Sequence, residues 1–348
     1  MLFAILLFSF LIFIHEFGHF SAAKLSGVQV NEFALFMGPA LFKRKWGETE
    51  YSIRCLPIGG YCAMEGENED SENPRSFQKA AVWKRLMILV AGSFMNFVTG
   101  ILLMAIVFAP AKHITVPVIS DVEEGCTIIR EDGLHVGDRF VEINGEKIYV
   151  SSDFSTLMAV KGGQYHDIVV ERDGERVVFE NYFMETHLFG DEKTPRFGFS
   201  FTVEEATFAN KVQYTWNSSI NVVRTVRLSL QMMLTGKAGL QDMTGPVGIV
   251  QIMSETAAQS ETVLDAVMNM LYFGAFLAIN LAVMNLLPIP ALDGGRVVGL
   301  LLTTAVEKVT RRKLDPKYET FIHGVGMVLL LALMAVILFK DIFVIFKG

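Results

Sequence analysis

Two histidines four residues apart, with a glutamate next to the first, are the most chemically specific feature of the sequence. His15, Glu16 and His19 lie in a long apolar segment with no charged residue before them. On a helix, positions i and i+4 share a face, so both imidazoles can bind one metal ion. Glu16 is turned about 100° from His15 and can reach a water on that metal without binding the metal itself. The pattern therefore predicts metal-assisted hydrolysis with Glu16 as the general base.

A second polar feature lies near the far end of the chain, in a hydrophobic stretch that contains Pro288, Pro290 and Asp293. Two prolines this close together end a helix or unwind it at membrane depth, which exposes backbone groups. A buried carboxylate without a partner is costly, so a cation is its natural partner. Two imidazoles, one carboxylate and a water satisfy a four-coordinate catalytic zinc site. The sequence therefore offers Asp293 as a carboxylate for a cation, alongside the two imidazoles as candidate zinc ligands.

The segment that carries the histidines is long enough to cross a membrane. Residues 2–23 are almost all apolar, and about 20 such residues span the hydrocarbon core of a bilayer. His15 then lies about 20 Å from the start of the helix, at a depth where ionisable groups are usually functional. A cleaved signal peptide needs a basic segment before its apolar run, and the first basic residue here is Lys24. A soluble helix would be amphipathic rather than apolar all round.

The composition is that of a membrane protein. The 348 residues are 51% hydrophobic, and the mean hydropathy is +0.40. The net charge of -7 and the lack of a basic cluster with interleaved aromatic residues argue against a nucleic-acid partner. The three cysteines form no CxxC pair, so they predict neither a disulfide framework nor a cysteine zinc site.

These features predict a multi-pass membrane protein, mainly α-helical, with four transmembrane helices, a membrane-associated β-hairpin loop and one extracytoplasmic PDZ-like α+β domain. The expected segments are a first transmembrane helix (1–24), a β-loop on the cytoplasmic side (25–84), a second transmembrane helix (85–110), the PDZ-like domain (111–203), an amphipathic helical segment (204–260), a third transmembrane helix (261–303), a cytoplasmic loop (304–320) and a fourth transmembrane helix (321–343).

The insert between the second span and the amphipathic segment has the turn signals of a β-rich domain. Asp132-Gly133, Asn144-Gly145 and Asp173-Gly174 indicate β-turns between strands. Residues 133–145 resemble the core of a PDZ domain, a module that binds peptides by adding a strand to a sheet edge. A purely structural β-rich insert is the alternative. Four histidines in or beside the insert lack metal-ligand spacing and are expected at the solvated surface: His113, His135, His166 and His187.

The distribution of lysine and arginine sets the expected orientation. Basic residues gather near the span ends in two segments, one between the first and second spans and one between the third and fourth. By the positive-inside rule both segments face the cytoplasm, which puts the PDZ-like domain outside. His15 and Asp293 then both lie toward the cytoplasmic third of the membrane.

The pairing of the 15–19 motif in the first span with the 285–294 stretch in the third resembles the site-2 protease family of intramembrane zinc metalloproteases, most closely its bacterial RseP type. Residues 59–61 and 91–96 also look like family motifs, so the resemblance covers nearly the whole chain. It implies a membrane-inserted β-hairpin that pairs with an unwound substrate. It also implies three sets of functional residues: the zinc ligands His15, His19 and Asp293, the catalytic base Glu16, and the substrate-binding residues Asn280, Asn285, Gly59, Gly60 and Tyr61.

The resemblance further implies that the protein hydrolyses peptide bonds within or near the transmembrane segments of single-pass membrane proteins. It places the protein in the cytoplasmic membrane of a bacterium, where cleavage releases a regulator, as with anti-sigma factors, or clears remnant signal peptides. Only one PDZ-like domain is present, which departs from relatives that carry two. The alternatives are a catalytically inactive PDZ-bearing membrane scaffold and a metal transporter. A transporter needs more polar residues across the membrane than Asn96 and Asn280.

Overall fold

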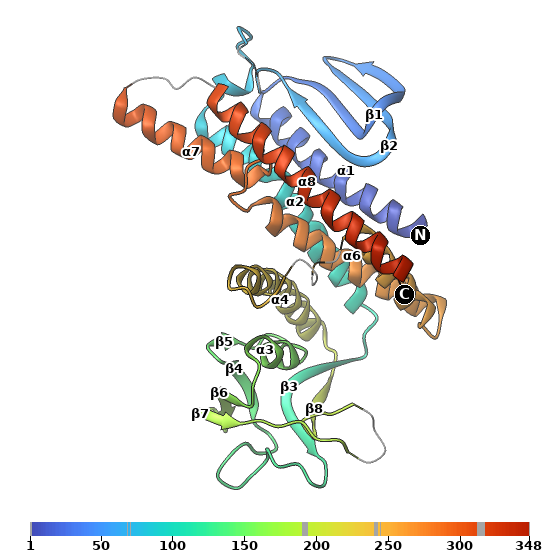
Figure 1. The fold of residues 1–348 in the computed structure, drawn as a ribbon, viewed down its shortest axis with the longest axis vertical. Helices are drawn as coiled ribbons and strands as arrows, with labels where there is room; N and C mark the ends of the chain where they lie inside the picture. Colours follow the sequence, from blue (N-terminus) through green and yellow to red (C-terminus); the bar gives the residue numbers. More distant parts are fainter. Residues whose placement is uncertain are drawn as a thin grey trace. The chain divides into compact units, whose positions relative to one another are not determined.

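The computed structural model describes residues 2–67, 69, 71–189, 194–239, 243, 245–311 and 317–347. They form two compact units, Met1–Leu103 with Gly236–Gly348, and Met104–Thr235. Figure 1 follows the helices and strands along the chain from blue to red. The predicted cytoplasmic loop 304–320 includes residues 312–316, which lie outside the described residues.

Four helices are long and apolar enough to cross a membrane, as the sequence predicts. A helix satisfies its backbone hydrogen bonds internally, which a lipid environment requires. The four are α1 (Leu2–Ser26), α2 (Val82–Phe108), α6 (Val263–Asn285) and α8 (Lys317–Lys347). The first unit also contains the 3-10 helix η1 (Phe77–Lys79) and the helices α5 (Pro246–Ala258) and α7 (Asp293–Thr310).

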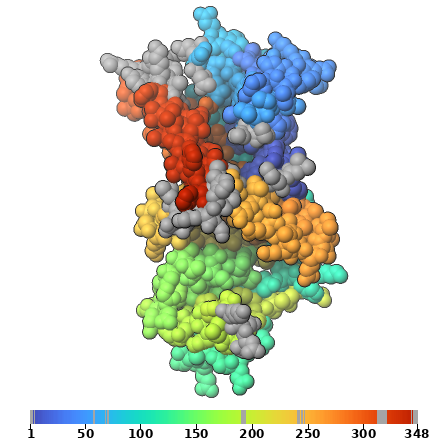
Figure 2. Space-filling view, turned by 45° about the vertical axis from the view of Figure 1, so that its right-hand side comes forward, coloured from blue at the N-terminus to red at the C-terminus, as the bar shows by residue number. Residues whose placement is uncertain are grey.

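Glycines bring the apolar helices of the first unit into close contact. A Cβ atom on Gly18 of α1 would lie 2.5 Å from the carbonyl oxygen of Ala91 in α2, so these two backbones touch. A Cβ atom on Gly100 of α2 would lie 2.4 Å from the side chain of Ile279 and 3.1 Å from the carbonyl oxygen of Ala275 in α6. Small residues permit such close approach between membrane helices. By contrast, none of the apolar span of α8 is buried, and its surface (red) stands open on the face drawn in Figure 2.

The two strands β1 (Val30–Trp46) and β2 (Thr49–Met64) form an antiparallel hairpin that folds back on itself. Leu35 of β1 pairs with both Gly60 and Ile53 of β2, so the first half of β1 lies between the two halves of β2. Gly59 has a φ angle of 71° at the bend before the last half of β2. Residues 60–64 therefore form one edge of the folded hairpin. Its association with the membrane stays a prediction.

The second unit contains an antiparallel sheet of six strands in the order β7-β6-β4-β3-β8, with β5 paired to β4. The rings of Phe140 and Phe154 pack in its core at a tilt, with their centroids 4.9 Å apart. The identity of this α+β unit as a PDZ domain stays a prediction. Its elements are β3 (His113–Val122), β4 (Arg139–Ile143), β5 (Glu146–Lys147), α3 (Asp153–Lys161), β6 (Tyr165–Arg172), β7 (Glu175–Phe183), β8 (Phe199–Glu205) and α4 (Phe208–Leu234).

Two predicted turns connect neighbouring strands of this sheet. Asn144 and Gly145 have φ angles of 52° and 82° between β4 and β5, and Asp173 and Gly174 have 52° and 83° between β6 and β7. Two successive positive φ angles match the right-handed twist of a two-residue hairpin, and Asn-Gly and Asp-Gly adopt them at low cost. Both turns confirm the sequence prediction.

The expectation that His166 is solvated is wrong. His166 is 1% exposed, and its Nδ1 lies 3.0 Å from Nδ2 of Asn144. Burial lowers the pKa of His166 and favours its neutral form. On β6 it shares the inward face with Ile168 and Val170, which are also buried. This period of two along the strand is the signal that could have found it.

A buried ion pair fastens α4 to α3 within the second unit. Nη2 of Arg224 lies 2.8 Å from Oδ2 of Asp153, and both side chains are almost fully buried. The same carboxylate oxygen accepts hydrogen bonds from the backbone N–H groups of Tyr149 and Val150. Such an arrangement is strongly destabilised when only one partner is removed, because the other charge stays buried.

Replacing Arg224 by alanine is therefore expected to lower the free energy of unfolding of this unit by about 3–5 kcal/mol. Arg227, three residues along the same helix, pairs with Glu146 at the surface. Arg227→Ala is the matched control and should cost less than about 1 kcal/mol. Chemical denaturation of both variants in detergent, followed by a probe in the second unit, measures the difference. Equal losses would show that the Arg224 pair is not the stabilising contact.

Candidate metal centre

The structure brings together three side chains from opposite ends of the chain. His15 and His19 lie one turn apart on α1, and Asp293 is the first residue of α7. Oδ2 of Asp293 lies 3.2 Å from Nε2 of His15 and 3.3 Å from Nε2 of His19, and the two Nε2 atoms are 3.3 Å apart. Among the described residues this is the one group of three histidine, cysteine or acidic side chains whose ligand atoms all lie within 4.8 Å of one another.

The spacing and chemistry of these atoms fit a zinc ion. Four ligands placed tetrahedrally at about 2.0–2.1 Å from a metal are separated by about 3.3 Å. Oδ2 of Asp293 is buried and makes no hydrogen bond. A buried carboxylate oxygen that faces two imidazole nitrogens is stabilised by a shared cation. Two nitrogens and one oxygen also match the donor sets of catalytic zinc sites, which leave a fourth position open.

Hydrogen bonds on the far side of each imidazole set its orientation. Nδ1 of His19 lies 2.8 Å from the carbonyl oxygen of Ile88. A carbonyl only accepts, so Nδ1 carries the proton and Nε2 presents its lone pair to the site. Nδ1 of His15 faces the side-chain amide of Asn96 at 3.4 Å, while Oδ1 of Asn96 is buried without a partner. Turning this amide gives Oδ1 a partner in the Nδ1–H group of His15 and frees Nε2 of His15 for a metal.

A polar side chain such as Asn96 in an apolar helix either forms a helix–helix hydrogen bond or lines a functional site. The structure combines them, because this residue of α2 reaches a candidate ligand on α1. Four residues earlier on the same face of α2, Gly92 leaves the space that the two imidazoles occupy. A Cβ atom there would lie 2.3 Å from Nε2 of His19 and 2.8 Å from Cε1 of His15. From the sequence, Gly92 is recognised only as part of the 91–96 stretch; its spacing of four from Asn96 is the signal that could have placed it beside the histidines.

Asp293 is positioned by a tightly folded loop between α6 and α7. Two glycines follow it, and both lie against the backbone of that loop. A Cβ atom on Gly294 would be 2.2 Å from the carbonyl oxygen of Leu286, and one on Gly295 would be 2.3 Å from that of Ile289. The Asp-Gly-Gly sequence is thus required for the loop to close over the start of α7. One turn later, Arg296 forms an ion pair with Glu67 in the segment after β2.

Glu16 lies outside the group of three candidate ligands. Its side chain packs against the edge of the β-hairpin, because a Cβ atom on Gly60 would lie 3.1 Å from Cγ of Glu16 and 3.2 Å from Ile12. The last part of β2 therefore passes directly beside the predicted general base. This contact is possible only because position 60 carries no side chain.

The remaining predicted site residues divide into two groups. Gly59 and Tyr61 flank Gly60 on the same strand. Burial and the neighbouring carboxylate of Glu32 raise the pKa of Tyr61 to about 12, so its hydroxyl stays protonated. Asn280 and Asn285 lie in α6. Within the part of the chain that the structure describes, neither asparagine is hydrogen-bonded to the three candidate ligands, and their role stays a prediction.

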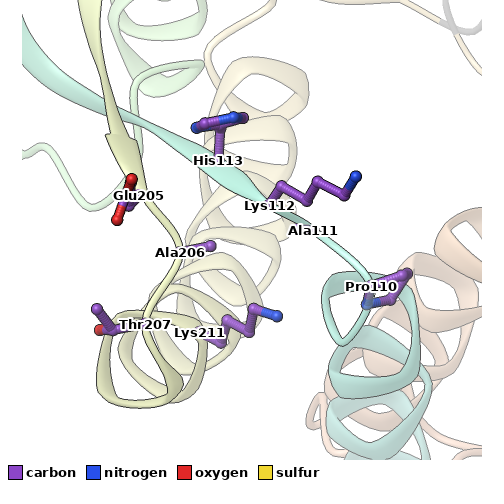
Figure 3. Close-up of a pocket in the computed structure, with 8 residues that line it drawn as sticks. All are labelled: Pro110, Ala111, Lys112, His113, Glu205, Ala206, Thr207 and Lys211. Atoms are coloured by element: carbon purple, nitrogen blue, oxygen red, sulfur yellow. The ribbon is translucent and has the colours of Figure 1, made fainter.

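A hollow in the second unit has no comparable ligand set. Figure 3 shows Lys112 and His113 at the start of β3 and Lys211 on α4. Nζ of Lys211 donates to the carbonyl oxygen of Ala109. The hollow is lined by Pro110, Ala111, Lys112, His113, Glu205, Ala206, Thr207 and Lys211. It contains one histidine and one carboxylate, so it is not a second candidate metal centre.

A candidate metal centre between α1, which can cross a membrane, and the start of α7 fits a membrane-embedded, metal-dependent hydrolase. The model of peptidase family M50 matches residues 3–333 of the chain. The chain therefore belongs to this family, the site-2 proteases.

Relatives that match nearly the whole chain carry names of the same class of protein. A Clostridium acetobutylicum protein whose name places it among the zinc metalloproteases is 36% identical over 342 residues, which cover 97% of this chain and 96% of the relative. Zinc metalloprotease RasP of Shouchella clausii is 27% identical over 419 residues, with 97% of each chain covered. Regulator of sigma-W protease RasP of Bacillus subtilis is 26% identical over 421 residues, again with 97% of each covered. The protein is a site-2 type zinc metalloprotease of the membrane.

Replacing Asp293 by asparagine is expected to weaken zinc binding by more than about tenfold. Asparagine keeps the shape of the side chain but removes the negative charge that faces the metal, and even residues that only support a ligand contribute about 10–100-fold to metal affinity. Zinc content per chain, measured after equilibration with a competing chelator, tests this directly. Unchanged stoichiometry and affinity in a folded variant would remove Asp293 from the ligand set.

Proposed function

We propose that this protein cleaves single-pass membrane proteins within or near their transmembrane segments, with His15, His19 and Asp293 as the zinc ligands and Glu16 as the general base. The convergence of the two imidazoles and the carboxylate at 3.2–3.3 Å carries the proposal. Zinc, when bound, polarises the scissile carbonyl and makes water nucleophilic at neutral pH. Glu16 removes the proton from the attacking water and passes it to the leaving nitrogen.

The edge of the hairpin is where the substrate is presented. A transmembrane helix hides its peptide bonds, so the substrate must unwind before water can attack. An extended segment can then pair with the exposed edge of a sheet. Residues 60–64 pair with β1 on one side, and no described strand pairs with their other side. Gly60 on this edge touches Glu16. Gly59, Tyr61, Asn280 and Asn285 complete the surface that binds the substrate backbone.

The names of the relatives support a biological setting for this proposal. The name of the Bacillus subtilis relative connects it with sigma-W. We place this chain in the cytoplasmic membrane of a bacterium, where it performs regulated intramembrane proteolysis on anti-sigma factors or remnant signal peptides. The second unit is an extracytoplasmic PDZ-like domain that acts on partners outside the cytoplasm, and the active site lies toward the cytoplasmic side.

The test is cleavage of a tagged single-span protein by the purified chain in liposomes. We expect cleavage inside the span, loss of cleavage with a zinc chelator and recovery when Zn²⁺ is returned. His113→Ala, which removes an exposed histidine of the second unit, is the control and should cleave at the wild-type rate. A zinc-loaded, folded protein that cleaves none of a panel of single-span proteins would instead favour a scaffold without catalytic activity.

A further inference from the structure

The loop that presents Asp293 contains a strained residue. Ala291 has a φ angle of 84°, in the left-handed region that favours glycine. A residue with a side chain costs energy in this conformation, and it persists only where the surrounding structure holds it. Ala291 lies two residues before Asp293, so the direction of the carboxylate depends on whether this conformation is kept.

Helix α8 contacts the strained segment through a hydrogen bond. Nδ1 of His323 lies 3.2 Å from the backbone nitrogen of Ala291. A backbone N–H can only donate, so Nδ1 of His323 is the acceptor and this ring carries its proton on Nε2. The bond satisfies the N–H group of a partly buried residue in a loop with no regular secondary structure.

The same helix also contacts the preceding residue. Gly326 lies one turn after His323, and a Cβ atom on it would be 2.4 Å from Cβ of Pro290 and 2.8 Å from its carbonyl oxygen. The backbone of α8 therefore presses against Pro290 while His323 holds Ala291. Helix α8 also contacts the start of α5, where Asp341 accepts hydrogen bonds from the backbone N–H groups of Gly245 and Gly248. The apolar span of α8 is otherwise largely exposed, and the contacts with Pro290 and Ala291 tie it to the loop before Asp293.

We propose that His323, with Gly326 beside it, is a positioning residue for the metal centre: α8 holds Pro290–Ala291 in the strained conformation that directs Asp293 toward His15 and His19. His323 acts through the loop and does not bind the metal itself. The inference rests on the proposed role of Asp293 as a zinc ligand. The proposal adds α8 to the three helices α1, α2 and α7 that form the candidate site.

The experiment measures zinc affinity of the full chain in detergent by competition with a chelator. His323→Ala should bind Zn²⁺ about 10–100-fold more weakly than the wild type. His323→Asn places an amide oxygen near the position of Nδ1 and should stay within a few-fold of the wild type. Gly324→Ala, on the same helix with no atom within 4 Å of the added methyl group, is the matched control and should not change affinity. At saturating Zn²⁺, His323→Ala should recover most of its cleavage rate with an unchanged KM.

A double-mutant cycle with Ala291→Gly tests the role of strain. Glycine adopts positive φ without penalty, so the loop should depend less on His323. The loss of zinc affinity caused by His323→Ala should therefore be several-fold smaller in the Ala291→Gly background than in the wild type. If His323→Ala alone fails to fold, the effect of His323→Ala on zinc affinity is measured within the Ala291→Gly background.

Two results would overturn the inference: wild-type zinc affinity in folded His323→Ala, or equal losses with and without Ala291→Gly. Asp293→Asn separates this failure from failure of the proposed function. If Asp293→Asn weakens zinc binding while His323→Ala does not, only the positioning role is wrong. If neither substitution affects zinc, the ligand set itself is wrong and the inference falls with it.

Discussion

Glutamine in place of Glu16 is expected to abolish proteolysis while zinc stays bound. The amide has nearly the same size as the carboxylate, so the contact with Gly60 is kept, but it cannot accept the proton from the attacking water. A general base contributes about 10²–10⁴-fold to the rate, so cleavage should fall by at least about a hundredfold. Glu16 lies outside the three candidate ligands, which is why metal content should not change.

The measurement pairs the rate of cleavage of a tagged single-span substrate with zinc content and melting temperature for the same preparation. Glu50→Gln is the matched control, because Glu50 lies in the same unit and pairs with Lys43 on an exposed part of the hairpin. It should cleave as the wild type does. A Glu16→Gln enzyme that retained full proteolysis would defeat the assignment of the base. Loss of zinc from this variant would instead make Glu16 a ligand.

The features that could be predicted from the sequence are those that depend on neighbours along the chain. The i, i+4 spacing places His15 and His19 on one face of any helix, and α1 confirms it. Long apolar stretches without charges predict the four membrane helices. The turn at Asn144-Gly145 follows from two residues that tolerate positive φ. Each of these conclusions needs no knowledge of what packs against the segment.

The rest depends on contacts between distant segments, which a single sequence does not encode in an obvious pattern. The double pairing of Leu35 with Gly60 and Ile53 requires β2 to bend around β1. The contact of Gly60 with Glu16 then depends on that bend. The hydrogen bond between His323 and Ala291 could be named only once α8 and the loop before Asp293 were placed together. The resemblance to a known family supplied the association of Asp293 with the histidines; periodicity could not.

Alanine in place of Gly92 is expected to remove zinc from the site. The new methyl group would lie 2.3 Å from Nε2 of His19 and 2.8 Å from Cε1 of His15, far closer than atoms can approach. One or both rings must turn, yet Nδ1 of His19 is held by the carbonyl of Ile88. The substitution displaces the candidate ligands directly, whereas removing a residue that only supports a ligand lowers metal affinity by about 10–100-fold. Zinc affinity should therefore fall by at least about 100-fold.

The helix itself should not suffer from this change, which makes the test selective. Alanine is a better helix former than glycine by about 1 kcal/mol, so any loss of function at position 92 is steric rather than a weakening of α2. Gly324→Ala controls for the same substitution in another apolar helix, where the added methyl group meets no atom within 4 Å. Zinc affinity by chelator competition and melting temperature are compared for both variants. If Gly92→Ala bound zinc as tightly as the wild type, the imidazoles would have to hold the metal from positions other than those in the structure, and the ligand geometry derived from α1 and α7 would be wrong.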